Sequence, residues 1–279
     1  MLVAAGALAV SLSVGVAVSG LDIKPHNYLL VLLAPALVMR RARRYLLDFV
    51  PFAVLIVLYA QCRGIAHDLR PDPFYAPQLD AEKLLFGGAV PSAELQEWLW
   101  TGTKQWYDHA AYVVTRLHFI VPPLLAFVLW VRRRALFYRF AATIVALSYV
   151  GALTFLLFPA APPWAAAEKG LLDVRKLPLD DVVPSATAGR LVDPNPYAAI
   201  PSLHAGYAFL CFLFVVVTLW RTRWRWWAIG LGAIYPLAES AAVVYTANHY
   251  VVDLVIGFAY AAAALAAVTW FWRRRGWPE

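Results

Sequence analysis

The sequence has 279 residues, of which 62% are hydrophobic and 15% charged, and its formal net charge is +7. Soluble globular domains contain about 45–50% apolar and about 25% charged residues, so this composition excludes an ordinary soluble domain. It predicts an all-α protein, a polytopic membrane helical bundle. The basic residues stand in short clusters between apolar blocks, which favours a role in membrane orientation over nucleic-acid binding.

Eight apolar runs follow one another along the chain. A bilayer core about 30 Å thick needs roughly 20 apolar residues for each spanning helix. We therefore predict about eight transmembrane helices, although the second run is short and the first two could form a shallow hairpin. N-terminal membrane helices would occupy 1–62, an extracytoplasmic interfacial segment 63–110 and a membrane core 111–279. The runs cover residues 2–19, 28–39, 46–62, 111–131, 135–158, 203–220, 226–245 and 250–272.

Arginine clusters follow every second apolar run. Short loops rich in Lys and Arg stay in the cytoplasm. If eight spans alternate, all four clusters and both termini are cytoplasmic, and residues 63–110, 159–201 and a turn near Asn248 face the other side. In the first of these, residues 79–86 and 92–100 have the pattern of amphipathic helices lying at the membrane interface. The alanine- and arginine-rich composition suggests a high-GC bacterium, hence a plasma-membrane protein. The clusters lie at 40–44, 132–139, 221–225 and 273–275.

His249 and Asp253 form the first candidate for chemistry. They are four residues apart, which places them on one face of a helix. Asp253 lies about one turn inside an apolar run, where an unpaired carboxylate is costly, so His249 is its nearest candidate partner. A carboxylate that holds one imidazole nitrogen leaves the other nitrogen free to attack. Taken alone, such a histidine could equally be a satisfied polar residue or part of a proton path.

Pro201, Ser202, Leu203 and His204 open the sixth apolar run. Pro201 suits the first turn of a helix, where its missing N–H is no loss. The helix start offers backbone N–H groups to a phosphate, and Ser202 adds a hydroxyl. His204, about one turn further on, is placed to protonate a leaving oxygen. The four-residue string is weak evidence alone, and the proline-rich 159–163 alone would only stop a helix, but together with His249 they indicate one site on the outer side.

These motifs resemble those of the type-2 phosphatidic acid phosphatase (PAP2) superfamily, in the branch that includes inositol phosphorylceramide synthase and sphingomyelin synthase. The string ending at His204 resembles the second family motif, His249 and Asp253 the third, and the Pro-Ala-Ala-Pro-Pro-Trp segment ending at Trp164 the first region. The resemblance runs from about residue 79 to 257 and implies a PAP2-like six-helix core in the later spans, within 111–279. Smaller shared elements are His118-Phe119 with Pro122, and Asp80 with Leu85-Phe86-Gly87.

The resemblance implies a mechanism. His249 would form a phosphohistidine, Asp253 would orient it, and His204 would protonate the leaving group, with no metal and no organic cofactor. We therefore expect a membrane lipid phosphotransferase or phosphatase whose partners are a lipid phosphate ester, membrane lipids and a hydroxyl acceptor, either lipid or sugar. Two alternatives remain: a proton-coupled lipid transporter or flippase, with Glu239 and Arg116 on the path, and a non-catalytic membrane scaffold.

The sequence departs from the common phosphatases in its cations. Those enzymes carry a Lys and an Arg in the first motif and an Arg six residues before the nucleophile, where this chain has Val243. The transferase-like branch shares the lack, which favours a phosphodiester substrate or a transfer reaction. Arg116 could face a phosphate in a cavity or pair with Asp108 or Asp253. The candidate substitutes are Arg116, Lys169, Arg175 and Arg190.

The remaining candidates for substrate binding are His118, Asn248 and Tyr245. Asn248 could donate to a phosphate oxygen or cap the following helix, and capping is favoured. Tyr245 falls one turn before His249 and could simply pack. Glu239 lies in the middle of the seventh run, where it could pair with a histidine or sit at a helix interface.

Overall fold

A computed structural model describes residues 6–12, 25–177 and 195–277. Within these ranges the regular secondary structure is helical, with isolated β-bridges only, which confirms the all-α prediction. Two shorter apolar helices are α2 (Pro25–Val38) and α10 (Leu203–Leu219). The count of eight spans stays a prediction, since most of the first run lies outside the described residues. Five helices are long and apolar enough to cross a membrane: α3 (Ala42–Leu69), α6 (Trp106–Arg132), α7 (Arg134–Leu157), α11 (Arg225–Tyr245) and α12 (Val251–Arg274).

Helix α3 continues beyond the apolar run that predicted it. Its 28 residues span about 42 Å at 1.5 Å per residue, more than the hydrocarbon core of a bilayer. The helix therefore includes residues 63–69, which the sequence assigned to the interfacial segment. This extension brings Arg63 into the bundle, where its Nη2 donates to the carbonyl oxygen of Asn195 at 3.1 Å.

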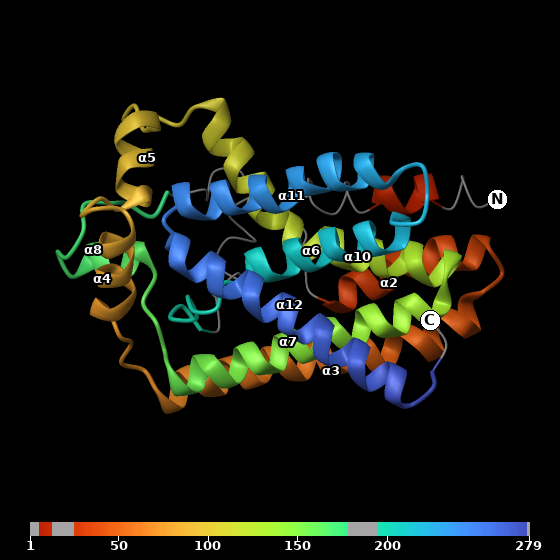
Figure 1. Cartoon of the computed structure of the whole chain (residues 1–279). Helices are drawn as coiled ribbons and strands as arrows, with labels where there is room; N and C mark the ends of the chain where they lie inside the picture. The colour runs from red at the N-terminus through yellow and green to blue at the C-terminus, as the bar shows by residue number, and fades with distance from the viewer. Residues whose placement is uncertain (1–5, 13–24, 178–194, 278–279) are drawn as a thin grey trace.

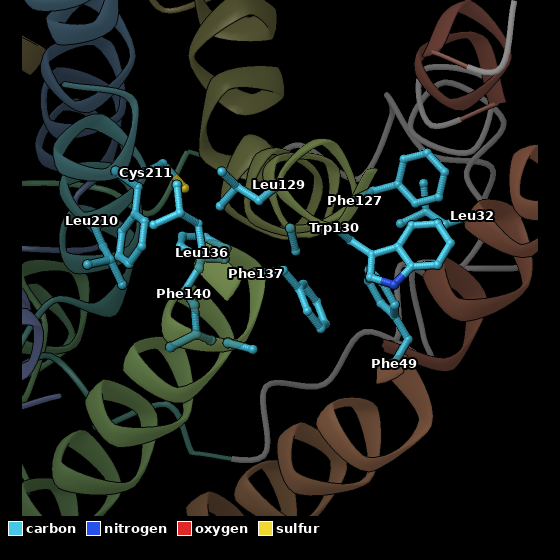
Figure 2. Packing of buried hydrophobic residues seen from close by; sticks show 14 of the residues in the cluster. Leu32, Phe49, Phe127, Leu129, Trp130, Leu136, Phe137, Phe140, Leu210 and Cys211 are labelled. Carbon is cyan, nitrogen blue, oxygen red and sulfur yellow. The ribbon is translucent and has the colours of Figure 1, made fainter. Parts of the chain in front are cut away.

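Aromatic side chains fill the interior between α3, α6 and α7 (Figure 2). The Phe49 ring stacks on Tyr45 and on Phe137, with centroid separations of 4.3 and 4.7 Å. Trp130 meets the Phe49 ring edge-on. Leu210 and Cys211 of α10 extend the same core toward the later helices. Helix α7 contacts α3, α6, α10 and α12, and α10 contacts α6, α7, α11 and α12, so these two helices connect the earlier spans to the later ones.

Three short helices, α4 (Ala76–Leu85), α5 (Pro91–Leu99) and α8 (Pro163–Glu168), gather at one end of the bundle, away from the C-terminus (Figure 1). The two stretches expected to form amphipathic helices are thus helical. They bury polar side chains and turn large apolar ones outward, Leu84 being 85% and Trp98 81% exposed. Exposed apolar side chains and buried polar ones are expected of helices that face lipid on one side and a polar interior on the other. The buried polar side chains are Gln78, Glu82, Ser92 and Gln96.

Candidate active site

The chain between α11 and α12 forms a tight turn that carries His249. Ala247 has φ +59°, a left-handed conformation costly for a residue other than glycine, and it reverses the chain. The backbone N–H groups of Asn248 and His249 both donate to the carbonyl oxygen of Val243, at 2.9 and 3.2 Å. His249 therefore lies before Tyr250, the N-cap of α12. The expectation that His249 and Asp253 share a helix face is wrong, because the turn places His249 outside the helix.

Asp253 nevertheless reaches His249. Its Oδ2 lies 3.4 Å from Nδ1 of His249 and accepts the backbone N–H of Tyr250 at 2.8 Å. The Asp253 carboxylate is fully buried and His249 is 4% exposed. A carboxylate at this position favours the imidazole tautomer with its proton on Nδ1, which leaves a lone pair on Nε2. One side chain thus caps α12 and orients the imidazole.

His204 stands at the beginning of α10. Ser202 is the N-cap of this helix, and its hydroxyl oxygen accepts the Ala205 N–H at 3.3 Å. Pro201 therefore precedes the N-cap, and the prediction that it occupies the first turn is wrong, because Ser202 takes the capping position. The Ser202 hydroxyl, expected at a phosphate, is engaged in this cap.

A backbone contact between α10 and α12 brings His204 to His249. The Ser202 N–H donates to the carbonyl oxygen of Asp253 at 3.1 Å. A Cβ on Gly257 would lie 2.3 Å from the Ser202 carbonyl oxygen, so only glycine permits this approach. As a result, Nδ1 of His204 lies 3.1 Å from Nε2 of His249, the nitrogen with the free lone pair.

His118 and Glu239 extend the line of ionisable side chains. The His118 ring is edge-on to the His204 ring, with centroids 4.0 Å apart, and its Nδ1 donates to the Thr115 carbonyl oxygen at 2.6 Å. The same Nδ1 is 3.7 Å from Oε1 of Glu239, so Glu239 pairs with a histidine. One ligand-type atom from each of His118, His204 and Glu239 lies within 4.8 Å of the others, an arrangement able to hold a metal ion. The expected absence of a metal stays a prediction.

Two arginines flank the histidines. Arg116 donates to the Tyr112 hydroxyl at 3.1 Å and lies 4.8 Å above its ring, instead of pairing with Asp108 or Asp253. The charges of Arg116 and Arg63 both act on His118 and His204. Arg63 was missed in the sequence, although its place at the end of an apolar run is the same kind of signal as that of Arg116. Of the other candidates, Lys169 and Arg175 are exposed, and Arg190 lies outside the described residues.

The remaining predicted binding residues have structural contacts. Asn248 donates to the Thr246 hydroxyl at 2.7 Å, and because Tyr250 is the N-cap, the prediction that Asn248 caps α12 is wrong. The Tyr245 hydroxyl donates to Asp108, and its carbonyl oxygen accepts the Gln96 side chain at 2.8 Å. Tyr245 therefore ties α11 to α6 and α5.

Glu82, on α4, is a further positioning residue that sequence reasoning missed. Its two carboxylate oxygens accept the backbone N–H groups of Val251 and Val252, at 2.9 and 3.1 Å. Burial raises the pKa of the Glu82 carboxyl, and these two donors oppose that rise. Asp80, the acidic residue singled out in the sequence, is exposed. Glu82 is buried and hydrogen-bonded, and Asp80 is exposed, because α4 lies against the first turn of α12 with the face that carries Glu82.

The proline-rich segment lies against the same turn. The Trp164 N–H donates to the carbonyl oxygen of Ala247 at 3.1 Å, directly before Asn248 and His249. The Ala160 N–H donates to the Tyr197 carbonyl oxygen at 3.0 Å. The structure thus brings together the three segments that the sequence singled out. They lie beside a row of side chains that runs from the buried Asp253 and His249 through the half-buried His204 and His118 to the buried Glu239.

Comparisons with known proteins agree with this arrangement. The chain is 24% identical over 235 residues to a phosphoinositol dihydroceramide synthase of Bacteroides thetaiotaomicron, covering 78% of this chain and 75% of the relative. It is 28% identical over 250 residues to the inositol phosphorylceramide synthase catalytic subunit of Schizosaccharomyces pombe, covering 82% of this chain and 55% of the relative. An inositolphosphotransferase of Saccharomyces cerevisiae is 28% identical over 189 residues, 62% of this chain and 31% of the relative.

No solved structure matches the chain. A family model described as the PAP2 superfamily matches residues 88–267, well over half of the sequence, and includes all three motif segments. With its apolar spanning helices and these relatives, the protein is a membrane-bound lipid phosphotransferase or phosphatase. The chain belongs to the PAP2 superfamily.

Proposed function

We propose that the protein transfers a phosphorylated head group from a lipid phosphodiester to a hydroxyl acceptor, through a phosphohistidine at His249. The observation that carries the proposal is the row in which the buried Asp253 lies 3.4 Å from Nδ1 of the buried His249, and the half-buried His204 lies 3.1 Å from Nε2 of His249. The orienting carboxylate and the acid thus lie on opposite sides of the His249 imidazole, one at each ring nitrogen. This is the arrangement that nucleophilic catalysis by a histidine requires. The names of the relatives, which are phosphoinositol and inositol phosphoryl transferases, support the same class of donor.

In the first half-reaction, Nε2 of His249 attacks the phosphorus atom. The N–P bond forms, the P–O bond to the lipid alcohol breaks, and the leaving oxygen takes a proton from His204. Asp253 stabilises the positive charge that develops on the imidazole, because its Oδ2 faces Nδ1. The phosphorylated head group is then attached to His249.

In the second half-reaction, a hydroxyl acceptor replaces the departed lipid alcohol. His204 accepts the hydroxyl proton, the new O–P bond forms, and the N–P bond to His249 breaks. A lipid or sugar hydroxyl gives transfer and water gives hydrolysis. The ceramide-linked names of two relatives support a lipid hydroxyl as acceptor.

The cations near the histidines support a diester substrate. A phosphodiester carries one negative charge, whereas a phosphate monoester carries nearly two at neutral pH. Arg116 and Arg63 act electrostatically on His118 and His204, in place of the lysine and arginines of the common phosphatases. The positive-inside pattern of the arginine clusters supports an active site on the extracytoplasmic face of a bacterial plasma membrane, with both termini cytoplasmic.

The test uses detergent-purified protein and radiophosphate-labelled phosphatidylinositol, phosphatidic acid and a polyprenyl diphosphate. Each donor is supplied with and without ceramide or diacylglycerol. We expect a new labelled phospholipid from the inositol lipid only when an acceptor is present. The His249→Ala variant should lose at least about 10³-fold of this rate, the size of loss seen when a nucleophile is removed.

The matched control is His109→Ala, which removes an exposed histidine of α6 and should leave turnover unchanged. Retained turnover in His249→Ala would refute the phosphohistidine. Free phosphate released from phosphatidic acid, with no acceptor requirement, would make the protein a phosphatase. Movement of labelled lipid across vesicles without chemical change would favour a transporter, and neither activity would favour a scaffold.

A further inference from the structure

Glu239 is a buried carboxylate with no hydrogen bond among the described residues. It lies in the middle of α11, its exposure is 0%, and both of its carboxylate oxygens lack a donor in this part of the chain. A carboxylate deprived of water and of donors is costly inside an apolar span unless another charge compensates for it. The motif residues of the proposed reaction do not include Glu239.

Two histidines lie beside Glu239. Oε1 of Glu239 is 3.7 Å from Nδ1 of His118, and a carboxylate oxygen lies within 4.8 Å of an imidazole nitrogen of His204. Arg63 of α3 and Arg116 of α6 also act on His118 and His204, and as cations they oppose a proton on this pair, which the negative charge of Glu239 offsets. Tyr235 lies one turn back along α11. Glu239 is thus the acidic end of the row, opposite Asp253.

The same three side chains could hold either a cation or a proton. Nδ1 of His118, the nitrogen nearest Glu239, is 2.6 Å from the Thr115 carbonyl oxygen. A carbonyl oxygen only accepts hydrogen bonds, so this nitrogen carries a hydrogen and has no lone pair for a metal. Nδ1 therefore offers Glu239 a hydrogen and not a metal ligand, as expected if a proton is shared among the three side chains.

We propose that Glu239 is the counter-ion that keeps a mobile proton on the His118–His204 pair, and that this is the proton His204 gives to the leaving oxygen. The inference rests on the proposed function and adds a positioning residue to it. In the first half-reaction the proton passes from His204 to the lipid alcohol as the P–O bond breaks. In the second, the acceptor hydroxyl returns a proton to His204 as the N–P bond breaks, so the pair ends in its initial state.

The test separates proton delivery from phosphorus attack. One donor is the lipid phosphodiester with its diacylglycerol leaving group. The other carries the same head-group phosphate on p-nitrophenol, whose phenolate leaves without needing a proton. Glu239→Gln should lower kcat on the lipid donor about 10²-fold or more, the usual contribution of a general acid, with KM changed less than about threefold. Its rate on the nitrophenyl donor should stay within about threefold of the wild type.

The controls distinguish failure of this inference from failure of the phosphohistidine. Glu97→Gln, the same substitution at an exposed position of α5, should change neither rate. His249→Ala should abolish both rates, and if it does not, the phosphohistidine fails whatever Glu239 does. If Glu239→Gln does not fold, His118→Gln provides the same ratio of rates and should show the same selective loss.

Three results would overturn the inference. Equal losses on the two donors would mean that Glu239 only supports the structure. Unchanged turnover of the lipid donor would mean that its charge is not needed. A wild-type activity that disappears with a chelator and returns with Zn²⁺ would assign the cluster of Glu239, His118 and His204 to a metal ion.

Discussion

Asp253 makes two contacts with one carboxylate oxygen. Its Oδ2 accepts the N–H of Tyr250, which caps α12, and faces Nδ1 of His249. The first contact contributes to stability, since an N-terminal cap is worth about 0.5–2 kcal/mol. The second sets the imidazole tautomer. A substitution that keeps this oxygen but removes its negative charge can therefore separate stability from catalysis.

The substitution Asp253→Asn should abolish turnover and leave the protein folded. The amide oxygen at the Oδ2 position can still accept the Tyr250 N–H and face Nδ1 of His249, but a neutral amide no longer stabilises the positive charge that the imidazole gains when it attacks. We expect kcat to fall about 10³–10⁴-fold, the scale of loss when the orienting carboxylate of a catalytic triad becomes an amide. Thermal unfolding in detergent should change little. Asp68→Asn, at an exposed position of α3, is the control, and near-normal turnover of Asp253→Asn would contradict this role.

At the scale of elements, the site depends on how closely α10 approaches α12. The Ser202 carbonyl oxygen would be 2.3 Å from a Cβ at Gly257, and a Cβ at Gly206 would be 3.3 Å from the Gly257 carbonyl oxygen. The two backbones are thus in direct contact near the first turns of the helices, which carry His204 and Asp253. His204 lies beside His249 because α10 and α12 pack more closely than a methyl group at Gly257 would permit.

Gly257→Ala should therefore move the two helices apart. Overpacking of this kind costs about 1–3 kcal/mol, and a displacement of about 1 Å in a catalytic group can lower the rate about 10²-fold. We expect a lower melting temperature and a lower kcat together. Gly230→Ala in α11 is the control, because a Cβ there has nothing within 4 Å. It should be neutral or slightly stabilising, since alanine is the better helix former. A Gly257→Ala variant with normal activity would refute the contact.

At the scale of the whole molecule, the two ends of the bundle differ in character. The helices α4, α5 and α8 gather at one end with the histidine site, as Figure 1 shows for the helices. At the other end, four arginines of the α2–α3 turn and the start of α3 line a hollow together with Arg134, whose guanidinium pairs with the buried Asp48 at 2.6 Å. Basic loops stay in the cytoplasm, so the site is expected outside.

Labelling of single cysteines in intact cells tests this orientation. Cys62 is exposed, so the background carries Cys62→Ser. Trp98→Cys and Trp224→Cys replace exposed tryptophans in α5 and just before α11. A membrane-impermeant maleimide should label the first in intact cells and the second only after permeabilisation. The opposite pattern would place the histidine site on the cytoplasmic face.

Apolar segments and motif spacing predicted a helical membrane bundle and the principal candidate site residues. Spanning helices could be predicted because hydrophobicity and length are local properties of a segment. His249 and Asp253 were predictable because four residues separate them, although the turn at Ala247, not a helix face, brings them together. Local sequence also offered alternatives that it could not resolve. Two helix starts differ from the prediction because a neighbouring residue is the N-cap. Ser202 caps α10, which leaves Pro201 outside the helix, and Tyr250 is at the N-cap position of α12 that was expected for Asn248.

Which distant side chains meet depends on how the helices pack. Glu82 reaches the first turn of α12 across 169 residues, and Tyr245 reaches Asp108 across 137. Helix length, capping and hydrophobic pattern carry no information about such pairs, because each pattern is complete within one segment. The contact between Glu239 and His118, like the position of Arg63, follows from how α3, α6 and α11 pack. The position of Glu239, at the acidic end of the proposed proton path, therefore depends on how the helices pack.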